Sequence, residues 1–147
     1  MIPPFNQDGY LPEGIYDCTT DEAAERFGGF QTSDRRPQLW TKLTEFIGEA
    51  KAGAFVEAVL IDGSFVTAKP DPNDIDIVLV VAANYDFSKD LPAALYNLLA
   101  QHRVRRRFGF DIVVVKNGSE NLKQAVAFFQ QVKQRPGVKK GILRIEL

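Results

Sequence analysis

The sequence predicts a single domain with a mixed α+β fold, and three observations favour this class. The chain has 147 residues, which is enough for one domain with its own hydrophobic core. Hydrophobic residues make up 45% and charged residues 25%, as is typical of globular proteins. Segments with apolar residues at helical spacing alternate with short apolar runs that are typical of buried strands. We therefore expect one folded domain in residues 20–147, preceded by an extended arm in residues 1–19.

Charge and cysteine content narrow the function classes. The formal net charge is -1, so the overall positive field that drives nonspecific binding to nucleic acid is absent. Cys18 is the only cysteine and His102 the only histidine, which excludes a disulfide, a thiolate cage and a histidine-based metal site. The N-terminus has no signal-peptide pattern, and no apolar run reaches the roughly 18 residues of a membrane span. We expect a cytoplasmic protein that does not interact with membranes.

The sequence of the N-terminal third of the chain predicts an extended arm followed by two helices. Proline and glycine among aromatic residues argue against a helix or strand in residues 1–19. Four side chains are expected to pin this arm to the domain: Phe5, Tyr10, Ile15 and Tyr16. A short helix should begin at Thr20 and end near Gly28, with acidic residues in its first turn. A second helix should run from a cap at Asp34 to Gly53, because apolar residues recur at intervals of three and four.

The rest of the chain alternates between strands and helices. Apolar runs predict strands at residues 55–61, 75–81, 109–115 and 141–147. After a break at residues 84–88, leucine spacing outlines a helix through Leu91, Leu95, Leu98 and Leu99, with Pro92 tolerated only near its start. Asn117, Gly118 and Ser119 should provide the turn and cap of a last helix carrying Leu122, Val126, Phe129 and Val132.

The candidate catalytic and binding residues lie around the first two of these strands. Gly63-Ser64 forms a turn after the first strand, and Asp74 and Asp76 stand at the start of the second. Because side chains alternate along a strand, the two carboxylates face one side. Asp111 heads a later strand, and three carboxylates would converge if that strand lay beside the second. Such a cluster offers the oxygen ligands that Mg²⁺ needs, with two ions expected and Mn²⁺ as an alternative.

Taken together, these residues resemble the signature of the DNA polymerase beta-like nucleotidyltransferase superfamily. The resemblance rests on Gly63-Ser64, nine intervening residues, Asp74-Ile75-Asp76 between apolar runs, and Asp111 on a later strand. It covers roughly residues 35–115 and is closest to minimal, single-domain bacterial members. The implied fold is a mixed β-sheet flanked by α-helices. The implied activity is transfer of a nucleoside monophosphate from a nucleoside triphosphate to a hydroxyl.

The resemblance also implies a role for each matching residue. Gly63 and Ser64 would hold the triphosphate, and Asp74 and Asp76 would bind the metal ions. Asp111 would complete the metal site and favour deprotonation of the acceptor hydroxyl, which is a general-base role. Asp74, Asp76 and Asp111 are therefore the expected catalytic and metal-binding residues.

Other polar residues are candidates for phosphate contacts, each with a structural alternative. Thr67 and Lys69 follow the glycine turn and either contact phosphate or face solvent. The C-terminal basic residues, Lys133, Arg135, Lys139 and Lys140, pose the same choice. Lys140 is favoured because the adjacent Gly141 permits close backbone approach. The basic residues at 103–107 either bind phosphates of a triphosphate or RNA, or form a solvated helix end. Asp62 is interpreted as stabilising the glycine turn.

The leading hypothesis is a metal-dependent nucleotidyltransferase that moves an NMP group, most simply AMP, onto a protein or RNA hydroxyl. The chain lacks an added helical domain for the acceptor, so a partner protein or a homo-oligomer would supply the missing wall. The alternative is a noncatalytic or weakly catalytic binding module, for example one component of a toxin–antitoxin pair. A third interpretation is an RNA-binding protein that uses the basic segments.

Overall fold

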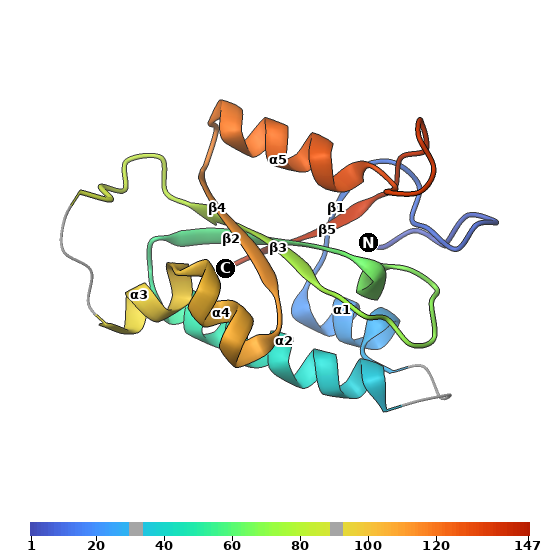
Figure 1. Cartoon of the computed structure of the whole chain (residues 1–147), viewed down its shortest axis with the longest axis horizontal. Coiled ribbons are helices and arrows are strands. Elements are labelled where there is room, and N and C mark those ends of the chain that lie inside the picture. The colour runs from blue at the N-terminus through green and yellow to red at the C-terminus, as the bar shows by residue number, and fades with distance from the viewer. Residues whose placement is uncertain (30–33, 89–92) are drawn as a thin grey trace.

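The computed structural model describes residues 1–29, 34–88 and 93–147 and confirms the mixed α+β fold (Figure 1). The strands are β1 (Ile15–Asp17), β2 (Val56–Asp62), β3 (Asp76–Val81), β4 (Asp111–Lys116) and β5 (Ile142–Glu146). The helices are α1 (Thr20–Phe27), α2 (Arg35–Ala52), α3 (Ala93–Leu99), α4 (Gln101–Phe108) and α5 (Glu120–Gln130), with a short 3-10 helix η1 (Ser64–Val66). The described strands form one sheet.

The sheet has the strand order β1-β5-β2-β3-β4 and mixes parallel with antiparallel pairs. β2 runs antiparallel to both of its neighbours, β3 and β5. β3 and β4 are parallel, as are β1 and β5. Every residue of β3 is buried, because this strand is near the centre of the sheet and both of its faces are covered. The start of β3 therefore lies in the interior of the fold.

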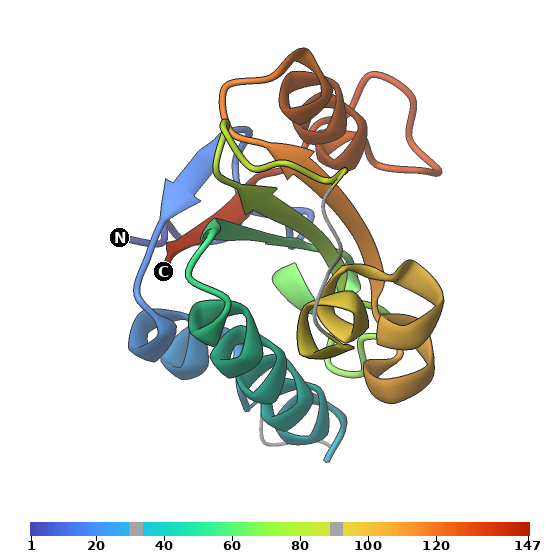
Figure 2. The same ribbon diagram turned by 90° about the vertical axis from the view of Figure 1, so that its left-hand side faces the viewer.

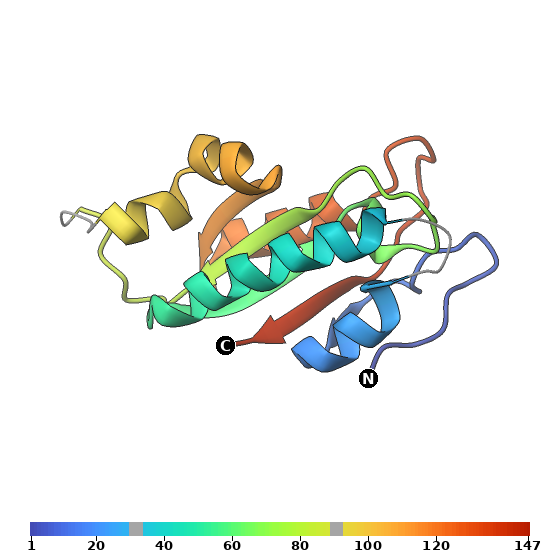
Figure 3. The same cartoon turned by 90° about the horizontal axis from the view of Figure 1, so that it is seen from below.

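Helices cover the two faces of the sheet unequally. Figure 2 shows α5 on one face of the sheet and α1, α2, α3 and α4 on the opposite face. α2 lies over the central strands, as seen from below in Figure 3. The larger core lies on this side and contains Leu43, Phe46 and Ile77. The smaller core lies under α5 and contains Leu60 and Val78. The α5 side is thus the thinner layer.

Of the two helix caps expected from the sequence, Ser119 is present and Asp34 is not, whereas α1 has a capping box that was not predicted. Thr19 and Glu22 form a capping box at the start of α1, with hydrogen bonds of 3.1 and 2.9 Å. The Ser119 hydroxyl accepts a hydrogen bond from the Leu122 amide at 3.2 Å and caps α5. Asp34 stands at the N-cap position of α2, but its side chain makes no capping hydrogen bond, so that detail of the prediction is wrong. α5 ends at Gln130, before the predicted Val132.

The N-terminal arm departs from the prediction because it contributes β1 to the sheet. β1 pairs in parallel with β5, with Ile15 opposite Ile142. The prediction of an arm without a strand is therefore wrong for residues 15–17. Ile15 is 45% exposed and is not an anchor, whereas Leu11 is fully buried. The Leu11 carbonyl accepts a hydrogen bond from the Gly141 amide at 2.9 Å, which joins the arm to the C-terminal segment.

The prediction that the other arm residues attach the arm to the domain is confirmed. Phe5 and Tyr16 pack against the main core, and Tyr10 forms an isolated bridge with Thr67. The arm thereby reaches the glycine-turn region, far along the sequence.

The predicted helix after residue 88 is instead two short helices, α3 and α4, which are separated at Ala100. Leu98 is buried in the main core. Leu91 and Pro92 lie outside the described residues. The basic residues 103–107 belong to α4, which buries Val104 and Phe108. No helix within the described ranges is long and apolar enough to cross a membrane.

Candidate functional site

Three aspartates lie side by side at one end of the sheet. Asp62 at the end of β2 is opposite Asp76 at the start of β3, and Asp76 is opposite Asp111 at the start of β4. Residues directly opposite on neighbouring strands project from the same face. The predicted condition, that the Asp111 strand lies beside the Asp76 strand, is confirmed. Asp62, which the sequence interpretation assigned to the turn, joins the same row.

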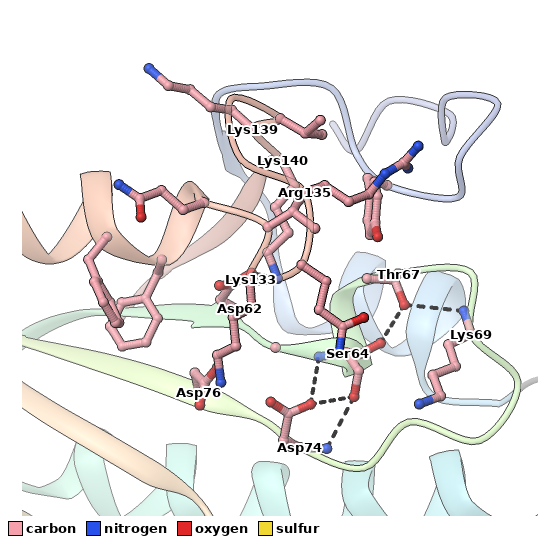
Figure 4. Close-up of a pocket in the computed structure, with 18 of the residues that line it drawn as sticks. Asp62, Ser64, Thr67, Lys69, Asp74, Asp76, Lys133, Arg135, Lys139 and Lys140 are labelled. Carbon is pink, nitrogen blue, oxygen red and sulfur yellow. Dashed lines mark hydrogen bonds and ion pairs between the residues drawn. The ribbon is translucent and has the colours of Figure 1, made fainter.

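Asp74 precedes β3 and is held by Ser64 (Figure 4). The Ser64 hydroxyl donates a hydrogen bond to Asp74 Oδ1, and the Ser64 amide donates another at 2.9 Å. The same hydroxyl accepts hydrogen bonds from the amides of Asn73 at 2.9 Å and Asp74 at 3.2 Å. A serine hydroxyl has one donor and two acceptor sites, so all three are engaged. Ser64 therefore orders the loop that carries Asp74, in addition to any role toward a ligand.

Gly63 allows the turn to pack against this loop. Its φ of 92° lies in the left-handed region, and a Cβ there would lie 2.8 Å from the Asp74 carbonyl oxygen and 3.1 Å from the Asp76 amide nitrogen. The Phe65 amide donates a hydrogen bond to the same carbonyl at 3.2 Å. Only glycine combines this backbone conformation with so close an approach. The backbone that approaches Gly63 closely in the structure is the loop carrying the acids.

Burial and neighbouring groups shift the pKa values of the carboxylates in different directions. Burial raises the pKa of Asp62 to about 7, although Lys140 acts in the opposite direction. Burial also raises the pKa of Asp76, and the charge of Asp74 adds to this effect. Burial opposes ionisation of Asp74 too, but hydrogen bonds from Ser64 and nearby lysine charges outweigh it and hold its pKa below the usual range. Asp74 is therefore firmly ionised at neutral pH.

Residues 131–140, called the basic loop below, fold back near the carboxylates (Figure 4). The loop closes where the Lys140 amide donates a hydrogen bond to the Gln130 carbonyl at 2.8 Å. Lys140 Nζ lies 3.3 Å from Asp62 Oδ1, and the Lys140 side chain is only 14% exposed. Asp62 Oδ1 is buried and accepts no hydrogen bond from the described residues. The ion pair thus places a cation among the acids.

The four basic residues of this loop have different partners. Lys133 and Lys140 act on the acids, because their charges lower the pKa of Asp74. Arg135 forms an ion pair with Asp8 at 3.4 Å, and Lys139 forms one with Glu13 at 3.5 Å. Asp8 and Glu13 both belong to the N-terminal arm. Lys140 therefore lies among the acids, whereas Lys139 faces the arm.

Thr67 and Lys69 are engaged in the loop after the glycine turn. The Thr67 hydroxyl donates a hydrogen bond to the Ser64 carbonyl at 2.6 Å and accepts one from the Lys69 amide at 3.2 Å. Arg36, which is fully buried, donates hydrogen bonds to several backbone carbonyls that include Phe65, Thr67 and Lys69. Burial lowers the pKa of Arg36 to about 10. Arg36 thus stabilises the loop after the glycine turn through hydrogen bonds to its backbone carbonyls.

The basic residues of α4 are largely paired on the protein itself. Arg105 binds Asp111 through two hydrogen bonds, of which the Nε–Oδ1 bond measures 2.9 Å. Arg107 forms a two-pronged pair with Glu49 at 2.9 and 2.7 Å. The Arg105 and Asp111 side chains are 60% and 54% exposed, so this pair contributes little to stability. The pairing with Glu49 favours the structural alternative for Arg107, a residue at a helix end. Arg105 lies at the site because it binds Asp111.

The aspartates, the glycine turn and the neighbouring basic side chains line one cleft of about 1170 Å³. All of the predicted site residues line it: Gly63, Ser64, Thr67, Asp74, Asp76, Asp111 and Lys140. Within residues 1–29, 34–88 and 93–147, no three His, Cys, Asp or Glu side chains are gathered closely enough to form a metal-binding group. The carboxylates share a cleft, but Asp74 is bound by Ser64 and Asp111 by Arg105.

Asp62 and Arg36 are the residues of this region that sequence reasoning missed. The sequence contains a signal for Asp62, because Asp62 alternates with Ala58 and Leu60 at the end of an apolar strand. It therefore projects from the same face as these residues, at the turn beside the acids. Arg36 carried none, because neither spacing nor composition marks an arginine that binds backbone carbonyls.

The fold and the cleft define a class: a single-domain α+β protein with a cleft at one end of a mixed sheet that is lined by both acidic and basic side chains. The chain matches the family DUF6932, described as a family of unknown function, over residues 3–146 and belongs to that family. No curated protein and no solved structure matches the chain.

Proposed function

We propose that this protein is a metal-dependent nucleotidyltransferase. It would transfer an NMP group, most simply AMP, from a nucleoside triphosphate to a hydroxyl of a protein or RNA acceptor. The observation that carries the proposal is the cleft itself. Asp74, Asp76 and Asp111 line it together with the glycine turn and a lysine that is already paired with an acid.

The donor set suits Mg²⁺ or Mn²⁺ in kind. Carboxylate oxygens are the ligands that these ions prefer, and the buried Asp62 Oδ1 has unused hydrogen-bonding capacity. Asp74, Asp76 and Asp111 would hold the metal once Asp74 and Asp111 exchange their present partners for it. A bound divalent ion would neutralise negative charge on the phosphates and on the leaving group.

The remaining chemistry falls to side chains of the chain itself. Lys140 and Lys133 supply positive charge for the triphosphate. Asp111 accepts the proton of the acceptor hydroxyl as its oxygen attacks the α-phosphorus. The bond from that phosphorus to the bridging oxygen breaks, and pyrophosphate leaves with the electron pair. One phosphoester bond forms and one phosphoanhydride bond is broken.

Labelling tests this proposal directly. The wild-type protein is incubated with labelled nucleoside triphosphates, Mg²⁺ and cell extract, alongside Asp76→Asn and Asp111→Asn. Loss of a positioned base or metal ligand should reduce labelling by about 100-fold or more. Asp71→Asn, at an exposed acid of the neighbouring loop, is the matched control and should label as wild type does. Equal labelling by all four proteins would exclude catalysis by these acids.

A second candidate is a noncatalytic or weakly catalytic binding module, such as one component of a toxin–antitoxin pair. The engagement of Asp74 by Ser64 and of Asp111 by Arg105 favours it, since neither acid is free for a metal in this arrangement. Coexpression with the product of a neighbouring gene tests this candidate. Equal retention of that partner by wild type and Asp76→Asn, without labelling by either, would support contact over catalysis.

The cellular setting belongs to the same proposal. We infer a cytoplasmic protein, because a single half-buried cysteine suits a reducing compartment. The acceptor wall would come from a partner protein or from a second copy of the chain. Sedimentation velocity with and without nucleotide separates these two possibilities.

A further inference from the structure

The cleft has an apolar end that the proposed chemistry does not use. Phe128 on α5 is 62% exposed, and Val113 on β4 is 40% exposed. Both residues line the cleft, as does Gln101 at the start of α4. Both side chains therefore expose apolar surface inside a concave site, which is where a bound apolar group would cover it.

The exposure follows from how α5 sits on the sheet. Its inner face packs on the smaller core through Leu122, Ala125, Val126 and Phe129. Phe128 is one residue, or about 100°, around the helix from Phe129 and therefore projects beside the contact. β4 is an edge strand, so α5 leaves Val113 partly uncovered. The Phe128 and Phe129 rings meet edge-to-face with their centroids 5.3 Å apart.

We propose that this apolar end binds the nucleobase of the nucleoside triphosphate, with the ring stacked on Phe128. The inference rests on the proposed function and adds a base-binding site to it. Val113 follows Asp111 by two residues on the same face of β4, so their Cα atoms are about 7 Å apart. That is the scale of a ribose. The apolar end therefore begins one sugar away from the acids.

The two ends of the cleft complement the two ends of a nucleotide. Lys140 and Lys133 provide positive charge near the acids, which suits the phosphates. Phe128 and Val113 provide an apolar wall, which suits the flat face of a base. The Gln101 amide can both donate and accept a hydrogen bond at the base edge. A ligand that is anionic at one end and aromatic at the other fits this distribution.

Calorimetric titration with MgATP and with magnesium tripolyphosphate, which has no base, tests the inference. Wild type should bind MgATP more tightly than tripolyphosphate. Phe128→Ala should weaken MgATP binding roughly 5- to 100-fold, the loss expected for one stacked base, and leave tripolyphosphate binding unchanged. Phe87→Ala is the matched control, because Phe87 is 44% exposed and is not part of the cleft lining. It should change neither affinity.

Each other outcome overturns the inference in a distinguishable way. Equal wild-type affinities for MgATP and tripolyphosphate, or an equal loss of both in Phe128→Ala, would remove the base site but leave the nucleotidyltransferase proposal standing. Failure of wild type to bind either probe would remove both. Sedimentation velocity showing a wild-type dimer that Phe128→Ala dissociates would assign the apolar end to a second copy of the chain instead.

Discussion

Replacing Asp62 with asparagine tests whether this buried carboxylate is a net cost to the fold. Burial raises the pKa of Asp62 to about 7 even though Lys140 Nζ lies 3.3 Å away. The cost of removing the charge from water therefore exceeds the attraction of the lysine. Asparagine keeps the shape of the side chain and carries no charge. We expect Asp62→Asn to be more stable than wild type above pH 7.

The magnitude follows from the proton balance. The pKa of Asp62 rises from 3.8, its value in an unfolded chain, to about 7 in the folded protein. Between these pH values the folded protein holds a proton that the unfolded chain has released. The free energy of unfolding consequently falls by about 1.4 kcal/mol per pH unit as the pH rises. This stabilisation is complete below about pH 4 and lost above about pH 7, which amounts to roughly 4 kcal/mol.

Urea denaturation between pH 5 and pH 8, followed by the fluorescence of Trp40 in the presence of EDTA, measures the effect. The difference between wild type and Asp62→Asn should grow with pH and level off near pH 8. Taking the difference cancels groups that titrate equally in both proteins. Asp71→Asn, at an exposed acid, should show no such trend. A difference that stays constant with pH, or a less stable Asp62→Asn at pH 8, would refute the reasoning.

Three further predictions concern the turn, the loop beneath it and the basic loop. Gly63→Ala should cost about 3 kcal/mol of stability in urea denaturation, because it combines strain at φ 92° with a Cβ 2.8 Å from a carbonyl oxygen. Gly109→Ala, at φ 79° but in open space, should cost only about 1 kcal/mol. Arg36→Lys should lower stability by about 3 kcal/mol in the same assay, since an ammonium cannot replace the forked hydrogen bonds to several carbonyls. Lys140→Met should weaken MgATP binding about tenfold by calorimetry, whereas Lys139→Met, which removes a cation that faces the arm, should not.

These predictions also have clear contrary results. Equal costs at Gly63 and Gly109 would mean that the close approach to the acid loop carries no strain of its own. An Arg36→Lys variant as stable as wild type would show that the carbonyl cluster does not depend on a guanidinium. Equal losses in the two lysine variants would remove the distinction between cations that face the acids and cations that face the arm.

Local patterns were sufficient to predict the two strands that begin with acids, β3 and β4. β3 and β4 are short, apolar and bounded by turns, and their leading acids stand out against those runs. The cap at Ser119 follows from its own side chain and the helix after it. Such features depend on neighbouring residues, which sequence periodicity reports well.

Features that depend on contacts between distant segments could not be predicted in this way. β1 has three residues and exists because β5, at the other end of the chain, pairs with it. Alternation along β2 places Asp62 on the face of Ala58 and Leu60, but only the strand register places it opposite Asp76. Ser64 looked like a ligand-binding serine, and only the structure shows that its hydroxyl orders Asp74.

The partners of the acids indicate that Asp76 is where an incoming cation would be stabilised most. Three neighbouring acids are each engaged: Asp62 by Lys140, Asp74 by Ser64 and Asp111 by Arg105. Asp76 stands between Asp62 and Asp111 in the register of the sheet, and burial together with the charge of Asp74 raises its pKa. A carboxylate whose ionisation is opposed by burial and by like charge gains most from a nearby positive charge. Asp76→Asn should therefore reduce cation affinity more than Asp111→Asn does, because Arg105 already neutralises Asp111.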